Sequence, residues 1–403
     1  MPGTAGRRRA PALLALLGAV LAPVLAGGAE PVRRPPVAAG RLVPPPGRED
    51  DGAQRGGAAP AVDVRRGGDP RNRITLVLLG DGFTAGQLGL FRAEAERAWR
   101  ALMAIEPFRT YQRFFNMRRV DIASPVPGVS EQRPPRRSPP SPLRMHFWCD
   151  GTARLLCVDE RAAVRLAGPV PGPHYVIAIA NSARYGGAGG SGVTTLAGGS
   201  ADAGRIIQHE MGHTLGDLGD EYDSADTDAD YPNLAAVDAA AMLRDHVKWW
   251  RWLGSRASDG SVVGAYPGAN GLYRPTPDSV MRTLGGAYNP PSQEAIIEAL
   301  YRRVDPVDAV SPAAGPVFGL PRLAVRPVPL AGGCALRVRW WVDGRPVRAQ
   351  SPDGSWFDPA YLGPLGGRSV TVTATVQDTT DRVRDEAFRA RWMTRTVRWT
   401  LRG

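Results

Sequence analysis

Residues 206–222 read Ile-Ile-Gln-His-Glu-Met-Gly-His-Thr-Leu-Gly-Asp-Leu-Gly-Asp-Glu-Tyr. Residues four apart lie on one face of an α-helix, so His209 and His213 can present two imidazoles to a single metal ion. Glu210 falls beside that face, where a carboxylate reaches a metal-bound water rather than the metal itself. Zinc lowers the pKa of such a water and polarises a carbonyl group. The stretch therefore predicts the active-site helix of a zinc-dependent hydrolase.

A third metal ligand is expected just after this helix. Gly216 and Gly219 can end the helix and turn the chain back. The acids Asp220 and Glu221 follow directly, and either carboxylate could complete the metal site. The alternative is a surface helix whose histidines are merely solvated, although two of the five histidines of the chain lie here.

The N-terminal residues predict export. Three arginines at positions 7–9 precede an apolar run over residues 10–26, and small residues follow, which together make a signal peptide over residues 1–29. A membrane anchor is the alternative, but the run is short for a membrane span and contains two prolines. We expect a secreted or periplasmic protein with no stable membrane insertion after cleavage.

The positive charge of the chain does not indicate a nucleic-acid partner. The net charge of +11 comes almost wholly from arginine, because Lys248 is the only lysine in 403 residues. The arginines are scattered and no aromatic-rich basic module accompanies them. We therefore expect no binding of nucleic acid.

Three cysteines are too few for a disulfide framework, although export makes a single bridge plausible. Cys149 and Cys157 are close enough in sequence to close a small loop. Cys334 would then be unpaired, and we expect it to be a small buried apolar side chain. No pair of cysteines has the spacing of a metal site.

Composition divides the rest of the chain into three parts. Residues 30–70 are rich in Pro, Gly, Arg and Ala without apolar periodicity, which is typical of a disordered linker or pro-segment. Residues 71–315 are predicted to form an α/β catalytic domain, because buried-strand runs alternate with a helix that the capping pair Thr84 and Gln87 opens. The predicted elements of this domain are strands at 74–79, 114–122 and 175–180 and a helix at 84–102.

The glycine-rich residues 185–199 lack the lysine and the spacing of phosphate-binding loops. We favour a flexible or edge-strand segment beside the active site, where an extended peptide could add through backbone hydrogen bonds. A plain surface loop is the alternative.

Residues 316–403 are predicted to form a β-sandwich. Apolar residues alternate with polar ones at 336–340, 370–376 and 397–401, and Asp343-Gly344 is typical of a turn between strands. This part has no catalytic cluster, so we expect it to support the catalytic domain or to present substrate.

Taken together, these segments resemble the IgA-peptidase family of secreted zinc metalloendopeptidases, which is known mainly from bacteria. The resemblance extends from about Ile74 to Leu401, and the helix with His209 and His213 is its most specific part. The supporting motifs are Gly80-Asp81-Gly82-Phe83-Thr84, Glu106-Pro107-Phe108, Phe115-Asn116, residues 124–130, Asp220-Glu221-Tyr222, Pro232-Asn233, Lys248-Trp249, Tyr273-Arg274-Pro275 and Ser279-Val280-Met281.

The resemblance implies an α/β (α+β) metzincin-like catalytic domain with one zinc ion, held by His209, His213 and Asp220, and with Glu210 as the base. In many zincins with a related elongated motif, the third ligand lies six residues after the second histidine. That position is glycine here and cannot ligate, so the acid comes one residue later. Glu221 remains the competitor for this role.

Met281 is similar to the methionine of the turn that floors such zinc sites, and plain core packing is compatible with that role. A tyrosine often donates a hydrogen bond to the oxyanion that develops at the attacked carbonyl. Tyr222, Tyr273 and Tyr288 are candidates, and a structural role is the alternative for each of them.

An acidic segment follows the motif and could bind a calcium ion, because carboxylate oxygens suit that cation. The spacing of its acids is not that of a known calcium loop, so we favour a solvated loop. The acids are Asp223, Asp226, Asp228 and Asp230.

These features predict a secreted zinc metalloendopeptidase that cleaves protein or peptide substrates with a water activated by Glu210 and zinc. Cleavage of immunoglobulin is a property of some members of the family and does not follow from this sequence. One alternative is an exported non-catalytic binding protein with a structural zinc site. Another is a zinc amidase that acts on cell-wall peptides.

Overall fold

The computed structural model describes residues 61–403 apart from 134–139, 191, 224, 226–227 and 334–335. The expected signal peptide at 1–29, most of the expected linker at 30–70 and the position of Cys334 lie outside the described residues. Within the described part of the chain, no helix is long and apolar enough to cross a membrane.

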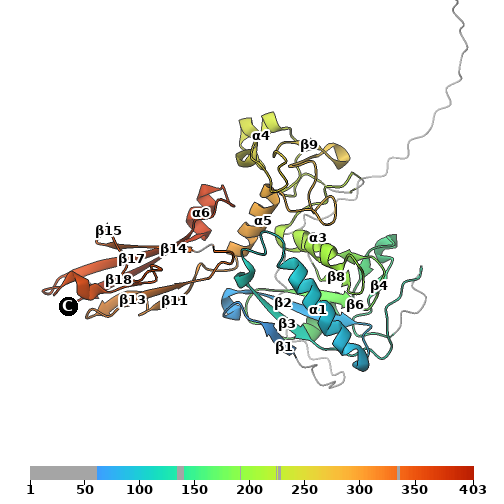
Figure 1. Cartoon of the computed structure of the whole chain (residues 1–403), viewed down its shortest axis with the longest axis horizontal. Coiled ribbons are helices and arrows are strands. Elements are labelled where there is room, and N and C mark those ends of the chain that lie inside the picture. Colours follow the sequence, from blue (N-terminus) through green and yellow to red (C-terminus); the bar gives the residue numbers. More distant parts are fainter. Residues whose placement is uncertain (1–60, 134–139, 191, 224, 226–227, 334–335) are drawn as a thin grey trace, which may run out of the picture. The chain divides into compact units, whose positions relative to one another are not determined.

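A six-stranded sheet is the framework of the part that contains the His-Glu-x-x-His motif (Figure 1). Its middle strands run parallel, and each edge strand is antiparallel to its neighbour. The strand order is β1 (Ala61–Arg65), β3 (Phe115–Val120), β2 (Ile74–Asp81), β6 (His174–Ala180), β8 (Thr194–Ala197) and β7 (Gly187–Ala188). The strands predicted at 74–79, 114–122 and 175–180 are thus confirmed as β2, β3 and β6.

Both faces of this sheet are covered, because successive side chains of a strand point to opposite faces. Leu76 and Val77, neighbours in β2, belong to different apolar clusters. The cluster around Leu76 includes α1 (Leu88–Leu102) and α3 (Ala203–Gly216), which lie side by side in Figure 1. The cluster around Val77 includes α2 (Glu160–Ala167). The predicted helix at 84–102 is confirmed as α1 preceded by a 3-10 turn.

Strand β1 corrects the expected extent of the linker. The prediction of disorder over residues 30–70 is wrong at its C-terminal end, because residues 61–65 pair antiparallel with β3. The Asp63 carboxylate also forms an ion pair with Arg118 of β3 at 2.9 Å. The surrounding Gly and Arg residues make this short segment look like a linker in sequence. Hydrogen bonds to a strand distant in sequence nevertheless order it.

The glycine-rich residues 185–199 contain two strands of the same sheet. β7 is an edge strand that pairs with β8, and β8 in turn lies between β7 and β6. The interpretation of this segment as an edge strand is confirmed for β7, whereas the internal strand β8 was not predicted. An internal strand as short as β8, four residues, shows little periodicity in sequence.

The chain between α3 and the next long helix, α5 (Pro290–Tyr301), forms a smaller layer with an apolar cluster of its own. Trp249 and Trp252 are buried in this cluster. Its regular elements are α4 (Ala239–Asp245), β9 (Tyr266–Pro267) and β10 (Tyr273–Arg274). Ile296 of α5 packs directly on α3, because a Cβ at Gly216 would lie 2.7 Å from its side chain.

Residues 307–403 form two further sheets. Trp340 stacks on Phe357 of the other sheet and on Trp399, with ring centroids 5.7 Å apart in both pairs, so the two sheets share an apolar interior. The three-stranded sheet has the order β11 (Val307–Ser311), β13 (Leu323–Pro327), β16 (Trp356–Phe357). The five-stranded sheet has the order β12 (Gly315–Phe318), β18 (Thr394–Arg402), β17 (Ser369–Asp378), β14 (Leu336–Val342), β15 (Arg345–Val347), and α6 (Glu386–Trp392) lies between β17 and β18 in sequence.

The strands predicted at 336–340, 370–376 and 397–401 are confirmed as β14, β17 and β18. The turn at Asp343 also forms, because Val342 pairs with Arg345 across a hairpin. The predicted boundary at residue 316 is too late, since β11 and β12 begin before it. Most residues of β11 are only half-buried, which weakens the apolar signal of the strand.

Asp378 links the two-sheet part to the first part of the chain. Its Oδ2 accepts hydrogen bonds from the hydroxyl groups of Tyr111 and Tyr301, each at 2.7 Å. All three side chains are buried. A second link is the ion pair of 2.7 Å between the fully buried Arg73 and Asp308 of β11.

Candidate metal centre and active-site cleft

Helix α3 directs two histidines to one point. The Nε2 atoms of His209 and His213 lie 3.2 Å apart. Nδ1 of His209 is 2.9 Å from the carbonyl oxygen of Val280, and Nδ1 of His213 is 2.6 Å from that of Leu218. These carbonyl groups favour a proton on each Nδ1, which leaves each Nε2 with a free lone pair. The helix therefore presents two oriented nitrogen ligands.

The loop after α3 adds a carboxylate oxygen. The helix ends at Gly216, and Asp217 takes a left-handed backbone conformation with a φ of 51°. A Cβ at Gly219 would lie 2.6 Å from the nearest side chain, so a larger residue in this turn would require its neighbours to shift. Oδ1 of Asp220 then lies 3.0 and 3.3 Å from the Nε2 atoms of the two histidines.

The neighbouring acid, Glu221, is occupied elsewhere. It is buried, and its Oε1 accepts hydrogen bonds from the side-chain amides of Asn233 and Asn289 at 2.8 and 3.2 Å. Its Oε2 accepts a hydrogen bond from the Ser279 hydroxyl at 2.7 Å. The structure thus brings Asp220, and not Glu221, to the two histidines, and Glu221 ties together three loops behind them.

The charge of Asp220 makes this point attractive to a cation. Among the described residues, His209, His213 and Asp220 form the group whose ligand atoms all lie within 4.8 Å of one another. Burial lowers the pKa of His213, but the close contact with Asp220 and its negative charge outweigh burial and raise that pKa to about 9. A field that favours a proton here also favours a metal ion, and two imidazoles with one carboxylate are a donor set that suits zinc.

Glu210 lies between the two histidines on α3 and is buried. Burial raises the pKa of its carboxyl group, and the nearby His213 and His209 oppose this effect. Strand β7 and the residues after it pass close by, because a Cβ at Gly189 would lie 2.9 Å from Oε2 of Glu210. A carboxylate whose pKa is raised by burial accepts a proton more readily than an exposed one.

Met281 lies behind α3. It is fully buried, and a Cβ at Gly212 would lie 2.6 Å from its Sδ. Its carbonyl oxygen accepts the backbone N–H of Glu221 at 2.9 Å. Tyr288 is also buried behind the helix, and its hydroxyl donates to the carbonyl of Gln208. This layer therefore fixes both the helix and the carboxylate loop.

His209 and Glu210 border a cleft of about 300 Å³. Some of the side chains that line it come from segments far from α3 in the sequence. The further side chains that line it are Arg154, Tyr185, Ile206, Tyr222, Arg282 and Leu284.

Of the three tyrosines considered as oxyanion donors, Tyr222 lies in this cleft. Its hydroxyl donates to Oδ2 of Asp220 at 2.8 Å and accepts a hydrogen bond from Nη2 of Arg154 at 3.1 Å. Burial and the charge of Asp220 raise the pKa of Tyr222 to about 12, so the phenol keeps its proton. Tyr273 pairs in β10, away from the cleft-lining residues, and Tyr288 lies behind the helix.

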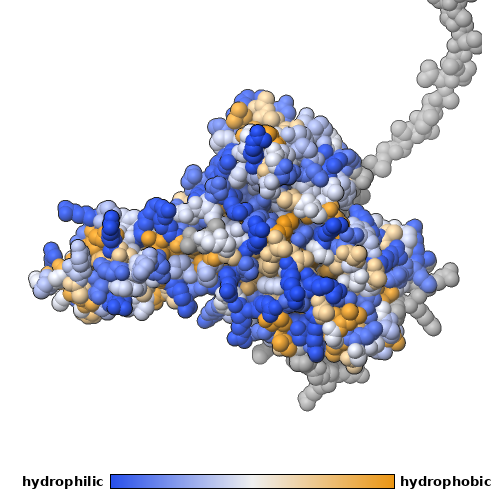
Figure 2. Space-filling model, viewed as in Figure 1, coloured by the Kyte–Doolittle hydropathy of each residue, from blue (hydrophilic) through white to orange (hydrophobic). Residues whose placement is uncertain are grey.

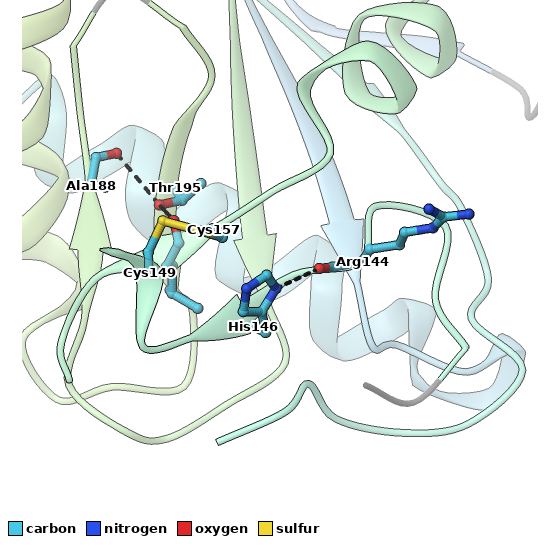
Figure 3. The surroundings of a disulfide bond; sticks show 7 residues. Arg144, His146, Cys149, Cys157, Ala188 and Thr195 are labelled. Atoms are coloured by element: carbon cyan, nitrogen blue, oxygen red, sulfur yellow. Dashed lines mark hydrogen bonds between the residues drawn. A yellow bond between two sulfur atoms is a disulfide. The ribbon is translucent and has the colours of Figure 1, made fainter. Parts of the chain in front are cut away.

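A disulfide closes the loop that carries Arg154. The bridge predicted between Cys149 and Cys157 is confirmed, and Figure 3 shows it close to Ala188 of β7. The carbonyl oxygen of Arg154 accepts the backbone N–H of Gly187, also in β7, at 3.2 Å. The flanking strands are β4 (His146–Phe147) and β5 (Leu156–Cys157), which pair antiparallel. The closed loop is thus attached to the edge strand of the cleft.

The acidic segment after the motif gives no support to the calcium alternative. Asp223 forms ion pairs with Arg274 and Arg282 at 3.2 and 3.0 Å. Asp228 accepts the backbone N–H of Asp230 at 2.9 Å, and Asp226 lies outside the described residues. In the described part of the chain, these acids do not form a group able to hold a cation.

Sequence reasoning did not identify Arg154 or Arg282 as residues of the cleft, whereas Tyr185 begins the segment 185–199 that was expected beside the active site. Neither arginine belongs to a motif with a spacing of its own. The Cys149–Cys157 pair, which was recognised, marks the loop of Arg154, but sequence separation alone does not say where such a loop lies.

The family model described as IgA Peptidase M64 matches residues 62–258. The match includes the six-stranded sheet, the two histidines of α3 and Asp220, so the resemblance inferred from the motifs is confirmed over these residues. A search of curated proteins found no match to the chain.

Proposed function

The chain belongs to the IgA Peptidase M64 family, and on this premise we propose that it is an exported zinc metalloendopeptidase. Membership makes the protein a peptidase with protein or peptide substrates. The proposal adds zinc as the metal, a metzincin-like catalytic domain, a β-sandwich formed by the two C-terminal sheets, and secretion or export to the periplasm.

One observation carries the proposal, namely the meeting of three ligand atoms beside a buried glutamate. His209, His213 and Asp220 would hold the zinc ion, since their ligand atoms lie within 4.8 Å of one another. Glu210 lines the same cleft. A purely structural zinc site has no need of a carboxylate base next to its ligands, which argues against the non-catalytic alternative.

The zinc ion, when bound, would supply a Lewis acid that polarises the substrate carbonyl and acidifies a water molecule. The remaining chemistry belongs to the side chains of the cleft. A carboxylate oxygen of Glu210 takes a proton from the attacking water and delivers it to the leaving amine nitrogen. The Tyr222 hydroxyl keeps its proton, which Asp220 accepts in this structure. Turned away from Asp220, the same O–H can donate a hydrogen bond to the oxygen of the attacked carbonyl.

We propose that the substrate lies in extended form along β7. This strand ends the six-stranded sheet and lies against Glu210. The N–H of Gly187 is already taken by the carbonyl of Arg154, so an extended peptide would add by backbone hydrogen bonds to the residues that follow Gly187. This places its carbonyl groups beside the helix without requiring a specific side chain. Polypeptide substrates therefore fit better than muropeptides, whose sugar chains do not pair with strands.

Nucleic acid is not part of the proposal. On the face drawn in Figure 2, hydrophilic residues predominate and the apolar residues form small separate groups. Many arginines of the first part are paired with acids, as in the pairs of Arg65 with Glu96 and of Arg118 with Asp63. Paired arginines offer little charge to a phosphate backbone.

Chelation and metal replacement test the proposal. The purified protein is incubated with an unbiased library of peptides from denatured proteins, before and after removal of metal, and cleavage products are identified by mass spectrometry. We expect endoproteolytic cleavage that stops on metal removal and returns with about one equivalent of zinc. Cleavage that is unaffected by metal removal would exclude the proposed mechanism, and cleavage of muropeptides alone would favour the amidase alternative.

A further inference from the structure

Resting on the proposed function, we infer that Arg154 selects peptides with an acidic side chain, Asp or Glu, at one fixed position close to the cleaved bond. The cleft would thus have a specificity subsite for a carboxylate.

Arg154 is fixed at the edge of the cleft by its backbone. The disulfide between Cys149 and Cys157 closes the loop around it, and its carbonyl oxygen accepts the N–H of Gly187 at 3.2 Å. Its side chain lines the same cleft as Glu210. A peptide that adds to the edge after Gly187 therefore runs close to the guanidinium group.

Among the described residues, most of the hydrogen-bonding capacity of this guanidinium group is unused. Nη2 donates to the Tyr222 hydroxyl at 3.1 Å, and the group lies 5.9 Å from the centre of the Tyr222 ring. Among the described residues, no carboxylate lies within 4.0 Å of it. Arginine carries five N–H donors in a planar fork that fits a carboxylate with two parallel bonds.

The second arginine of the cleft gives a contrast. Arg282 already forms an ion pair with Asp223 at 3.0 Å, and Asp223 also binds Arg274. Of the acids close to Arg154, Asp220 contacts the two histidines and Glu210 is buried. Arg154 therefore lacks a charge partner in the described protein, and an acidic substrate side chain can supply one.

A role for Arg154 in positioning Tyr222 alone is the competing explanation, and kinetics can separate the two. Matched peptides that differ by Glu or Gln at the selected position are compared through kcat/KM. A carboxylate bound by Arg154 should favour the Glu peptide by about tenfold or more. A purely positioning role affects both peptides equally and leaves their ratio near one.

The experiment uses the zinc-loaded protein and the variants Arg154→Gln, Arg154→Glu and Arg161→Gln, each checked for zinc content and for a native circular dichroism spectrum. Arg161 is exposed on α2 and does not line the cleft, so Arg161→Gln removes the same charge elsewhere. Cleavage sites in the denatured-protein library locate the selected position, and the matched peptides are then made for that position.

We expect the wild type and Arg161→Gln to prefer the Glu peptide, Arg154→Gln to lose the preference, and Arg154→Glu to prefer Lys or Arg at the same position. A wild type that cuts without acidic preference, or an Arg154→Gln variant that keeps the preference, would overturn the inference while the peptidase assignment stands. Absence of any zinc-dependent cleavage would instead contradict the proposed function, and the inference with it.

Discussion

Residues 61–306 and residues 307–403 differ in where they keep buried charge. Among the described residues of the second part, Asp378 is the one buried acidic or basic side chain. The interior of that part is otherwise built from apolar side chains such as Trp340 and Trp399. The first part buries Arg73, Asp81, Glu94, Glu210, Glu221 and Arg274.

The locations of these buried charged side chains suit a catalytic role for the first part and a supporting role for the second. A buried charge is costly unless it is bonded, so its presence needs a local reason. In the first part, Glu210 and Glu221 lie at or directly behind the cleft. In the second part, Asp378 binds Tyr111 and Tyr301, which both belong to the first part. The two-sheet part thus uses its buried charge as an attachment to the part that carries the site.

The adjacent acids Asp220 and Glu221 should respond very differently to substitution. In Asp220→Ala we expect zinc to be lost on dialysis and kcat/KM to fall on the order of 10³-fold or more, because the metal chemistry is lost. In Glu221→Gln we expect zinc to stay, while the free energy of unfolding falls by about 1–3 kcal/mol because one buried acceptor is lost.

Zinc content, kcat/KM and urea unfolding check this pair of variants. The assignment of roles fails if Asp220→Ala keeps its zinc. It fails equally if a folded Glu221→Gln loses the metal.

Asp378→Ala should destabilise the protein without changing its chemistry. The substitution leaves the buried hydroxyl groups of Tyr111 and Tyr301 without their acceptor, and each unpaired group costs about 1–3 kcal/mol. We expect the free energy of unfolding to fall by roughly 3 kcal/mol in urea titrations, with zinc content unchanged. Asp381→Ala, at an exposed position close by, is the control and should change stability little. Equal effects of both substitutions would refute the attachment role.

Glu94 should make stability depend on pH. Burial raises the pKa of its carboxyl group from 4.5 to about 7, and Arg97 only partly offsets this. The folded state therefore binds the proton more tightly than the unfolded state. The resulting contribution of Glu94 to the free energy of unfolding is present below pH 4.5 and is lost as the pH rises through about 7. The Glu94→Gln side chain does not titrate, so the variant avoids this loss. We expect the free energy of unfolding of the variant, relative to the wild type, to be on the order of 2 kcal/mol more favourable at pH 8 than at pH 4.5. A difference between the two proteins that does not change with pH would contradict this assignment.

The parts of the fold that sequence could predict are those with a local cause. Helix α3 follows from the spacing of its ligands and from the glycines after it, and β2 and β6 follow from continuous apolar runs. Strand β1 depends on pairing with β3, and the four-residue strand β8 depends on its place between two others. Such long-range pairings leave little trace in a short window of sequence.

The residues of the site also divide into those with a local cause in the sequence and those that depend on the fold. His209, Glu210 and His213 could be read from helix geometry alone. The choice between Asp220 and Glu221 required the turn at Asp217, since neighbouring residues can exchange roles with a small change of backbone. Arg154 reaches the cleft through a disulfide-closed loop and a contact with β7. No spacing of residues in the sequence predicts this arrangement.

The proposed peptidase mechanism requires Glu210 to act as the base beside a zinc ion. The most direct measurement compares the wild type with Glu210→Gln, recording zinc content and kcat/KM for one cleaved peptide in the same samples. We expect equal zinc in both proteins and a kcat/KM about 10²- to 10⁴-fold lower in the variant, because the carboxylate that accepts the proton is gone while the ligands remain. A variant that retains zinc and cleaves as fast as the wild type would contradict this mechanism.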